Sequence, residues 1–376
     1  MRNEAHFATK GNRSPLAVPE SLLARLEAVD EARGDQRSLM RAIARMSEAY
    51  TTDRASLGEV GRSAGGLRAR LRFFLPRDLP KALRPMLELE RRGLLPAGDP
   101  LRVLDLGAGL GTTSLSVARA LALSGDARAL SVLALDEDAR ALDAFARIAA
   151  KPIEGFAPIQ LHTRRASLPG ALEEISDRFD LVTIGLALNE LGAPEALLRL
   201  AASRLAPGGV LLILEPALRE TTRALMHLRD GIAEHGELAI LGPCPHHAPC
   251  PMLARERDWC HDAVDVPLSP PLDGWARAAG LRDDRPTFAW LALGARARPD
   301  DVAHRVVSHR LPSKGKLELI LCGPEGELSR ARRLDRHASE ANASLTTTAR
   351  GDRLEVTGEA RGGALVIGES DAVVRR

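Results

Sequence analysis

The stretch VLDLGAGLGTTSLSVARAL, residues 103–121, determines how this chain folds. A short apolar run leads into three closely spaced glycines, Gly107, Gly109 and Gly111, and a segment with helical spacing of apolar residues follows. Glycine permits positive φ and close approach of a ligand to the backbone, and a helix N-terminus offers unpaired N–H groups. The stretch therefore predicts a buried strand, a ligand-binding turn and a helix.

The next apolar run, VLALD, ends in Asp136, 25 residues after Gly111. A carboxylate at the end of the second strand can accept hydrogen bonds from both hydroxyls of a ribose. Two classes of cofactor fit such a site, a dinucleotide and S-adenosylmethionine.

Outside this turn, short apolar runs alternate with helical segments through LRVLDLG, ALSVLALD, IQLHTRR, FDLVTIGLA and GVLLILEP. Strands that alternate with helices predict an α/β fold with a parallel sheet. We expect an N-terminal helical region at 1–96 and the α/β domain at 97–298, with a cysteine-rich insertion at about 240–268 after the fifth strand. A small β extension should occupy 299–376.

The acidic residue before the first glycine, in Asp105-Leu-Gly107-Ala-Gly109-Leu-Gly111, resembles motif I of the class I S-adenosylmethionine methyltransferases rather than the GxGxxG of dehydrogenases. The segments FDLVTIGLALNEL (179–191) and LAPGGVLLILEPA (205–217) also resemble the fourth- and fifth-strand motifs of that superfamily. The resemblance implies a Rossmann-like sheet. It also implies that Asp105 lies near the methionine part, that the three glycines line the cofactor, and that Asp136 binds the ribose.

The methyl acceptor is left open by the sequence. The Asn/Asp-Pro-Pro-aromatic signature of enzymes that methylate exocyclic base nitrogens is replaced here by GLALNEL. Asn189 and Glu190 are either polar contacts at the mouth of the site or, as we favour, caps of the next helix. Because methyl transfer needs mainly a positioned nucleophile, the missing signature does not exclude catalysis.

Composition excludes several classes of protein. The chain has 376 residues, is 45% hydrophobic, and carries 52 basic against 50 acidic residues, so its net charge of +2 indicates neither a nucleic-acid binder nor an acidic-ligand binder. Residues 54–84 are the exception, with eight basic and two acidic residues. They predict either a solvated helix face or an RNA-facing patch. With neither a signal-peptide h-region nor a membrane span, we expect a cytoplasmic protein.

The four cysteines raise a separate question. Three of them, Cys244, Cys250 and Cys260, lie in GPCPHHAPCPMLARERDWCH (242–261), and the fourth is Cys322 in LELILCG. In a reducing compartment such residues are metal ligands or buried core residues rather than disulfides. Thiolates suit zinc or an iron–sulfur cluster, although the paired C-x2-4-C spacing of structural zinc sites is missing. His246, His247 and His261 are candidate zinc ligands or packing partners.

The string Cys-Pro-His to Asp-Trp-Cys-His, placed after the fifth strand and followed by LILCG, resembles the methyltransferase-like assembly proteins of the ribosomal small subunit, known from mitochondria and with bacterial relatives. The resemblance implies a 4Fe-4S cluster on Cys244, Cys250, Cys260 and Cys322, and an association with small-subunit rRNA or its precursor. We expect a bacterial member that is monomeric off the ribosome.

The chain departs from that family's pattern at Arg350-Gly351-Asp352, where the family has Trp-Gly-Asp, and its aromatic content is 3%. Two alternatives to an assembly factor in which methyl transfer is optional stay open. One is an active rRNA methyltransferase, and the other is a methyltransferase of small molecules whose cysteines bind zinc.

Overall fold

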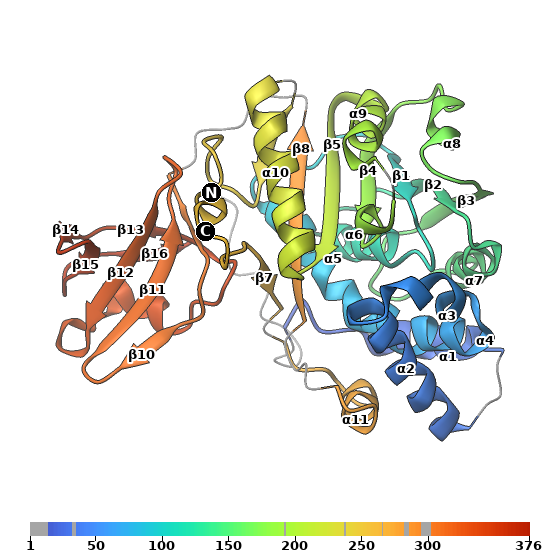
Figure 1. Ribbon diagram of the computed structural model, residues 1–376, viewed down its shortest axis with the longest axis horizontal. Helices are drawn as coiled ribbons and strands as arrows, with labels where there is room; N and C mark the ends of the chain where they lie inside the picture. Colours follow the sequence, from blue (N-terminus) through green and yellow to red (C-terminus); the bar gives the residue numbers. More distant parts are fainter. Residues whose placement is uncertain are drawn as a thin grey trace.

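The computed structural model describes residues 14–31, 35–191, 193–236, 238–264, 266–281, 286–294 and 302–376. They form two β-sheets with helices gathered around the first (Figure 1). We keep the ranges 1–96, 97–298 and 299–376 as a proposal for the domains; residues 1–13 of the first range lie outside the described residues.

The first sheet has the order β3-β2-β1-β4-β5-β8-β6, and β7 also pairs with β8. Its first five strands are parallel, whereas β8 runs antiparallel to β5, β6 and β7. The α/β class is thereby confirmed, with a mixed sheet in place of the parallel one that we predicted. The strands are β1 (Leu101–Leu106), β2 (Leu130–Asp136), β3 (Ile159–Arg165), β4 (Phe179–Gly185), β5 (Leu205–Pro216), β6 (Ala239–Gly242), β7 (Asp262–Ala263) and β8 (Thr287–Gly294).

Alternate side chains of these strands enter two different cores, as the two-residue period of a strand requires. On β1, Val103 packs toward α1, α5, α6 and α7, whereas Leu104 packs toward α8, α9 and α10. The helices are α1 (Glu20–Val29), α2 (Gln36–Thr51), α3 (Leu57–Arg62), α4 (Ala64–Ala69), α5 (Leu75–Arg91), α6 (Thr112–Leu123), α7 (Ala139–Ala149), α8 (Gly170–Glu173), α9 (Pro194–Ser203), α10 (Arg219–His235) and α11 (Leu272–Ala278). A π-helical turn, Arg70–Phe74, joins α4 to α5.

The second sheet, with the order β14-β15-β12-β11-β9-β13-β16 and β10 paired with β11, has a small core of its own. It lies beside the end of the first sheet that carries β7, with the cysteine segment between the two (Figure 1). Its strands are β9 (His304–Val306), β10 (Leu311–Ser313), β11 (Lys316–Cys322), β12 (Leu328–Leu334), β13 (Arg353–Val356), β14 (Glu359–Arg361), β15 (Ala364–Ile367) and β16 (Val373–Arg375).

Two elements between β5 and the cysteine segment were not predicted from the sequence. Helix α10 and then β6 lie between them. The segment therefore begins at the edge of the sheet, where β6 pairs with β8.

Within the described ranges, no helix is both long enough and apolar enough to span a membrane.

Candidate cofactor cavity and cysteine segment

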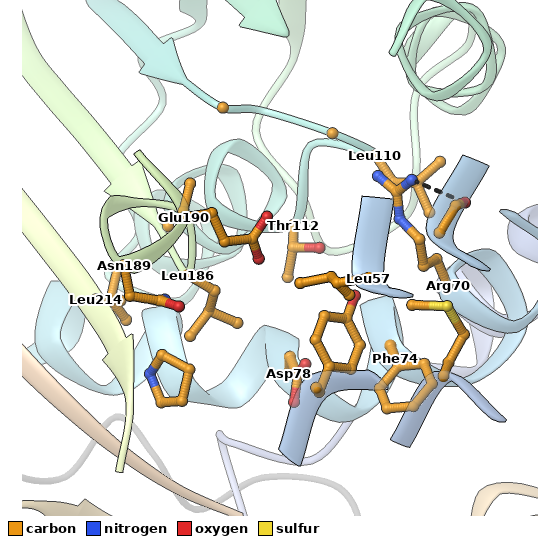
Figure 2. A pocket seen from close by; sticks show the side chains of 18 of the residues that line it. Leu57, Arg70, Phe74, Asp78, Leu110, Thr112, Leu186, Asn189, Glu190 and Leu214 are labelled. Atoms are coloured by element: carbon orange, nitrogen blue, oxygen red, sulfur yellow. Dashed lines mark hydrogen bonds between the residues drawn. The ribbon is translucent and has the colours of Figure 1, made fainter. Parts of the chain in front are cut away.

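A cavity of about 800 Å³ lies over the glycine turn. Its floor contains Gly107 and Gly109, and Asp136 lies at its side. The opposite wall comes from the N-terminal helices and includes Phe74 and Asp78 (Figure 2). Tyr50 and Lys81, from the same helical region, also line the cavity. The site is thus built at the carboxyl ends of β1, β2 and β4, where α/β folds bind their ligands, and it is closed by residues from outside the sheet.

All three predicted glycines have positive φ, at 68° for Gly107, 51° for Gly109 and 78° for Gly111. A Cβ at Gly107 would lie 2.7 Å from the Cβ of Ala187, and one at Gly111 would lie 2.2 Å from the ring of Phe145. Gly107 and Gly109 line the cavity, whereas Gly111 belongs to the contact between the turn and α7. The turn therefore offers a bare backbone to a ligand, which fits a nucleotide-type cofactor.

Asp136 connects the ends of two strands to the turn. Its Oδ2 accepts a hydrogen bond from the N–H of Gly109 at 2.7 Å, and its Oδ1 accepts one from the N–H of Asp138 at 2.8 Å. Because each carboxylate oxygen has a second lone pair, the group is oriented and can still accept hydroxyl protons from a ligand.

Asp105 lies beneath the glycine turn and is held by two hydroxyl groups. Its side chain is almost fully buried, does not line the cavity, and accepts hydrogen bonds from Ser114 Oγ at 2.6 Å and Thr183 Oγ1 at 2.9 Å. Burial raises the pKa of this carboxyl, against the effect of the two hydroxyl donors. In this structure Asp105 holds β1, β4 and α6 together; contact with a cofactor stays a prediction.

Sequence reasoning missed Arg70. Its Nη1 donates to Asp138 Oδ2 at 2.8 Å, and its Nη2 lies 3.0 Å from the position that a Cβ of Gly109 would occupy. Arg70 comes from the turn before α5, more than thirty residues ahead of the glycines, so no local pattern could have connected the two.

Asn189 and Glu190 do not cap the following helix. They form a 3-10 turn, and α9 begins at Pro194 without any side-chain cap. Both residues line the cavity, Asn189 Oδ1 accepts a hydrogen bond from Arg54, and burial raises the pKa of Glu190. The capping interpretation was wrong, and the polar-contact alternative is the one that the geometry supports.

The basic stretch at 54–84 is largely turned inward. Its side chains in carboxylate ion pairs are only 9–18% exposed, and they are Arg68, Arg70, Arg72, Arg77, Lys81 and Arg84. These six form neither a solvated face nor an RNA-facing patch. The charge bias of this stretch mainly neutralises buried acids.

The four cysteines converge on one region between α10 and the second sheet. Cys244, Cys250 and Cys322 are buried, and Cys260 is half-buried. Burial raises the pKa of Cys250 to about 12 and also raises that of Cys260 and Cys322, and in each case the neighbouring Cys244 adds to the effect. The four thiols therefore share one low-dielectric environment, although no group of three or more His, Cys, Asp or Glu side chains in the described residues has the arrangement of a metal site.

Two arginines of α10 organise the cysteine segment through its carbonyl groups. Arg223 donates to the carbonyls of four residues, and Arg229, which is fully buried, donates to those of His246 and Ala248. The carbonyls bound by Arg223 belong to Met252, Leu253, Arg255 and Asp258. A neighbouring carboxylate, Asp230, accepts the N–H of Cys250 at 3.0 Å. The segment is thus held by α10 independently of any metal.

The three histidines of the segment lie differently. His246 Nε2 is 3.3 Å from Cys322 Sγ, a hydrogen-bonding distance for sulfur, so it joins the insertion to β11. His261 stacks on Trp259 with ring centroids 5.5 Å apart and contacts Arg350, while His247 has interactions of its own. For His246 and His261, packing and hydrogen bonding are the roles seen.

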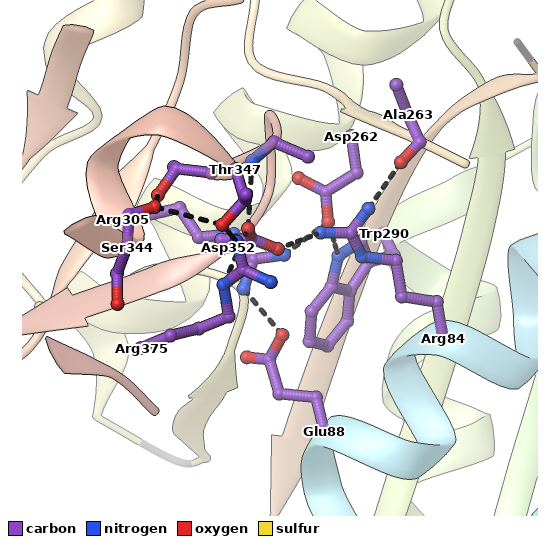
Figure 3. Close-up of polar contacts among 12 residues, drawn as sticks. Arg84, Glu88, Asp262, Ala263, Trp290, Arg305, Ser344, Thr347, Asp352 and Arg375 are labelled. Atoms are coloured by element: carbon purple, nitrogen blue, oxygen red, sulfur yellow. Dashed lines mark hydrogen bonds and ion pairs between the residues drawn. The ribbon is translucent and has the colours of Figure 1, made fainter. Parts of the chain in front are cut away.

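A buried charge network connects the second sheet to the rest of the molecule (Figure 3). Arg305 of β9 donates to Glu88 of α5 at 2.6 Å and to Asp262 of β7, and Asp262 also accepts from Trp290 Nε1 at 2.7 Å. A second pair, Arg84 with Asp352, lies alongside at 3.1 Å. Asp352 is the last residue of the Arg350-Gly351-Asp352 sequence. The departure from the family pattern is therefore confined to Arg350, and the aspartate that pairs with Arg84 is retained.

Several solved structures of methyltransferases match this chain at low similarity. A methyltransferase from Geobacter sulfurreducens in complex with S-adenosyl-L-homocysteine is 15% identical, with coverage of 58% of this chain and 91% of that one and a TM-score of 0.35. The precorrin-6y C5,15-methyltransferase of Geobacter metallireducens is 16% identical, with coverage of 57% and 89% and a TM-score of 0.35. The plantazolicin methyltransferase BpumL is 11% identical, with coverage of 73% and 99% and a TM-score of 0.38. These similarities are too low to carry a statement about this chain's ligand.

No curated protein gives a significant match to the sequence. A family profile described as mitochondrial small ribosomal subunit Rsm22 does match, over residues 83–354. The matched range runs from α5 into β13 and includes the glycine turn, Asp136 and all four cysteines. Since that range covers well over half of the chain, this protein belongs to the Rsm22 family of the small ribosomal subunit.

Proposed function

We propose that this protein is an S-adenosylmethionine-binding, iron–sulfur-containing factor that acts on the small ribosomal subunit by binding rRNA during assembly or translation. The family match over residues 83–354 is the observation that carries the proposal, because the family's description is of the small ribosomal subunit. Retained methyl transfer to rRNA is the second candidate function, favoured by the polar residues Asn189 and Glu190 in the cavity wall.

S-adenosylmethionine would supply an activated methyl group when bound. The backbone of Gly107 and Gly109 would lie against it, the oriented carboxylate of Asp136 would accept its ribose hydroxyls, and Arg70 would close the site from the N-terminal side. The cavity of about 800 Å³ is large enough for a cofactor of this size.

We assign the cluster to Cys244, Cys250, Cys260 and Cys322. Three buried thiols and one half-buried thiol in one environment fit the donor set of a 4Fe-4S cluster, and with every iron bound by a cysteine the cluster would have a structural or redox role rather than bind substrate. It would join the insertion to β11 of the second sheet. Zinc on the same residues is the alternative.

Metal content tests this assignment. After anaerobic purification we expect a brown protein with about four irons and four sulfides per chain. Alanine at any of the four cysteines should remove the iron, whereas Ile320→Val on the same strand as Cys322 should keep it. A colourless protein with one zinc per chain would contradict the cluster.

Calorimetric titration with S-adenosylmethionine tests the cavity. Asp136→Ala should weaken binding by about tenfold or more, since two charge-assisted hydrogen bonds are lost. The matched control is Asp143→Ala, an exposed acid on α7 that does not line the cavity. Equal affinities of the two variants would contradict the site, and transfer of labelled methyl groups to small-subunit RNA would favour the second candidate function.

We also propose that the protein is monomeric off the ribosome and works in a bacterial cytoplasm. Analytical ultracentrifugation of the purified protein, alone and with small subunits, tests the first point.

A further inference from the structure

A second, smaller cavity, of about 210 Å³, lies where the second sheet meets β7. One wall is Ala263 of β7, another is the segment after β9 with His309, Arg310 and Pro312, and the third is the turn before β13 with Thr348, Ala349 and Arg350. None of these residues belongs to the cofactor cavity or to the four cysteines. The cavity is therefore a separate feature of the molecule.

Arg350 is a half-buried cation without an acidic partner. Its Nη1 donates to the carbonyl of His261 at 3.3 Å and lies 3.2 Å from His261 Nδ1, while its Nε is buried and has no hydrogen-bond partner. No carboxylate pairs with it in the part of the chain that the structure describes. Asp262 acts on Arg350 electrostatically but forms no ion pair with it. Taking a guanidinium out of water without a directly paired anion is unfavourable, so an anion in the cavity would stabilise this side chain.

The other buried arginines of this protein show what is missing. Arg305 contacts Glu88 and Asp262, Arg84 contacts Asp352, and Arg229 contacts Asp230. Each of these three cations has at least one carboxylate within ion-pair distance, whereas the buried Arg333 donates to the carbonyl and side-chain oxygens of Asn342 instead. Arg350 differs from them, and it is also the one that lines a cavity.

Arg310 extends the positive charge to the rim of the cavity. Its side chain is exposed, its Nη1 donates to the carbonyl of Thr346, and no ion pair is found for it among the described residues. Two guanidinium groups on opposite walls match the geometry of an oxyanion, which can accept several hydrogen bonds at once.

The volume limits what can enter. The volume of this cavity is smaller than that of typical sites for drug-sized ligands and equals the volume of several water molecules, at about 30 Å³ each. A single phosphate group is small enough to enter a cavity of this size. A phosphodiester of a longer chain fits best, since the exposed Arg310 and His309 lead from the cavity to the surface.

We propose that Arg350 and Arg310 bind one phosphate group of an RNA backbone in this cavity. The inference rests on the proposed function only for the source of the phosphate. It places one RNA contact on the second sheet, next to the cysteine segment, rather than on the basic stretch at 54–84.

The test is RNA binding by the full-length, anaerobically purified protein at a series of KCl concentrations, measured by anisotropy of a fluorescent single-stranded RNA. The double variant Arg310→Gln/Arg350→Gln should bind about tenfold more weakly at low salt. Losing one phosphate contact should also reduce the slope of log K against log salt by about 0.7. Arg310→Gln alone should give a smaller change in the same direction, and because this residue is exposed, its variant should fold normally.

The matched control is Arg361→Gln, which removes an exposed arginine of β14 outside the cavity and should leave the slope unchanged. The visible spectrum of each variant separates loss of an RNA contact from loss of a cluster. If the wild type binds RNA and the double variant shows the same affinity and slope, the proposal is overturned.

Titration with inorganic phosphate distinguishes this proposal from the proposed function. Phosphate binding that is lost in the double variant, by a protein that does not bind RNA, would support the anion site and overturn the role on rRNA. A wild-type protein that binds neither probe would overturn both.

Discussion

Glu215, near the end of β5, is a carboxyl group that is only 1% exposed. Burial raises its pKa from an ordinary 4.5 to about 7, and its Oε2 has no hydrogen-bond partner among the described residues. The folded state favours the protonated form of this carboxyl. Its contribution to the free energy of unfolding is therefore fully present below pH 4.5 and is lost as the pH rises to about 7. At about 1.4 kcal/mol per pKa unit, the loss is roughly 3 kcal/mol.

Glu215→Gln should therefore stabilise the protein at pH 8 relative to the wild type and flatten the dependence of its unfolding free energy on pH between 5 and 7. Urea unfolding at several pH values measures this difference. The control is Glu173→Gln, an exposed acid of α8, which should change nothing in that range. Parallel curves for the wild type and Glu215→Gln would mean that Glu215 is ionised when folded.

Gly111 and Gly125 have similar positive φ values, 78° and 71°, but different surroundings. A Cβ at Gly111 overlaps the ring of Phe145, whereas one at Gly125 meets nothing within 4 Å. Alanine should cost about 1–2 kcal/mol at either position for the left-handed backbone, and about 1–3 kcal/mol more at Gly111 for the overlap. Thermal unfolding of the two variants checks this difference, and equal costs would contradict the contact with α7.

At the scale of elements, the central strands of the first sheet could be predicted from the sequence, whereas α10 could not. Strands β1, β4 and β5 were predictable because they are nearly continuous apolar runs bounded by turn residues. Helix α10 was missed because its buried face contains Thr221, Thr222 and Arg229 beside only two apolar residues, so a pattern of apolar residues alone marks it weakly. Its polar side chains are nevertheless the ones that hold the cysteine segment.

The candidate site likewise contains residues that the sequence could predict and residues that it could not. Gly107, Gly109 and Asp136 could be predicted because they lie within one strand–turn–helix–strand unit. Tyr50 and Arg70 reach the cavity from helices that pack there only in the folded molecule, and no sequence spacing encodes that arrangement. Burial of Asp105 was equally invisible, since it depends on Thr183 from a different strand.

The contact between α5 and β9 depends on one side chain, that of Arg305. Arg305→Met would leave Glu88 and Asp262 buried without this cation, and we expect a loss of about 3–5 kcal/mol in the free energy of unfolding. The matched control is Arg277→Gln, whose side chain is 73% exposed and pairs with Asp273 on the surface of α11. That change should cost less than about 1 kcal/mol, and a similar small cost for Arg305→Met would show that the network adds little.

At the scale of the whole molecule, the proposed cluster would link the two sheets, because Cys322 is on β11 and the other three cysteines follow β6. Removing the iron with a chelator should therefore speed amide hydrogen exchange in β11 and in the cysteine segment. Strands β1 and β4, whose pairing involves no cysteine, should exchange as before. Unchanged protection of β11 would mean that the charge network alone joins the sheets.

The pairing of Arg305 with Glu88 also has a consequence for how the protein is made. The two residues are 217 positions apart, so a translating ribosome that adds about 5–20 residues per second needs roughly 10–40 s to go from one to the other. Throughout that interval Glu88 has only its longer ion pair with Arg92, at 3.7 Å, and lacks the shorter one with Arg305, so burying it early would be less favourable than in the finished fold. Helix α5 should therefore reach its final position only after β9 has left the ribosome. Folding of the first quarter of the chain is then completed only once the last quarter has been synthesised.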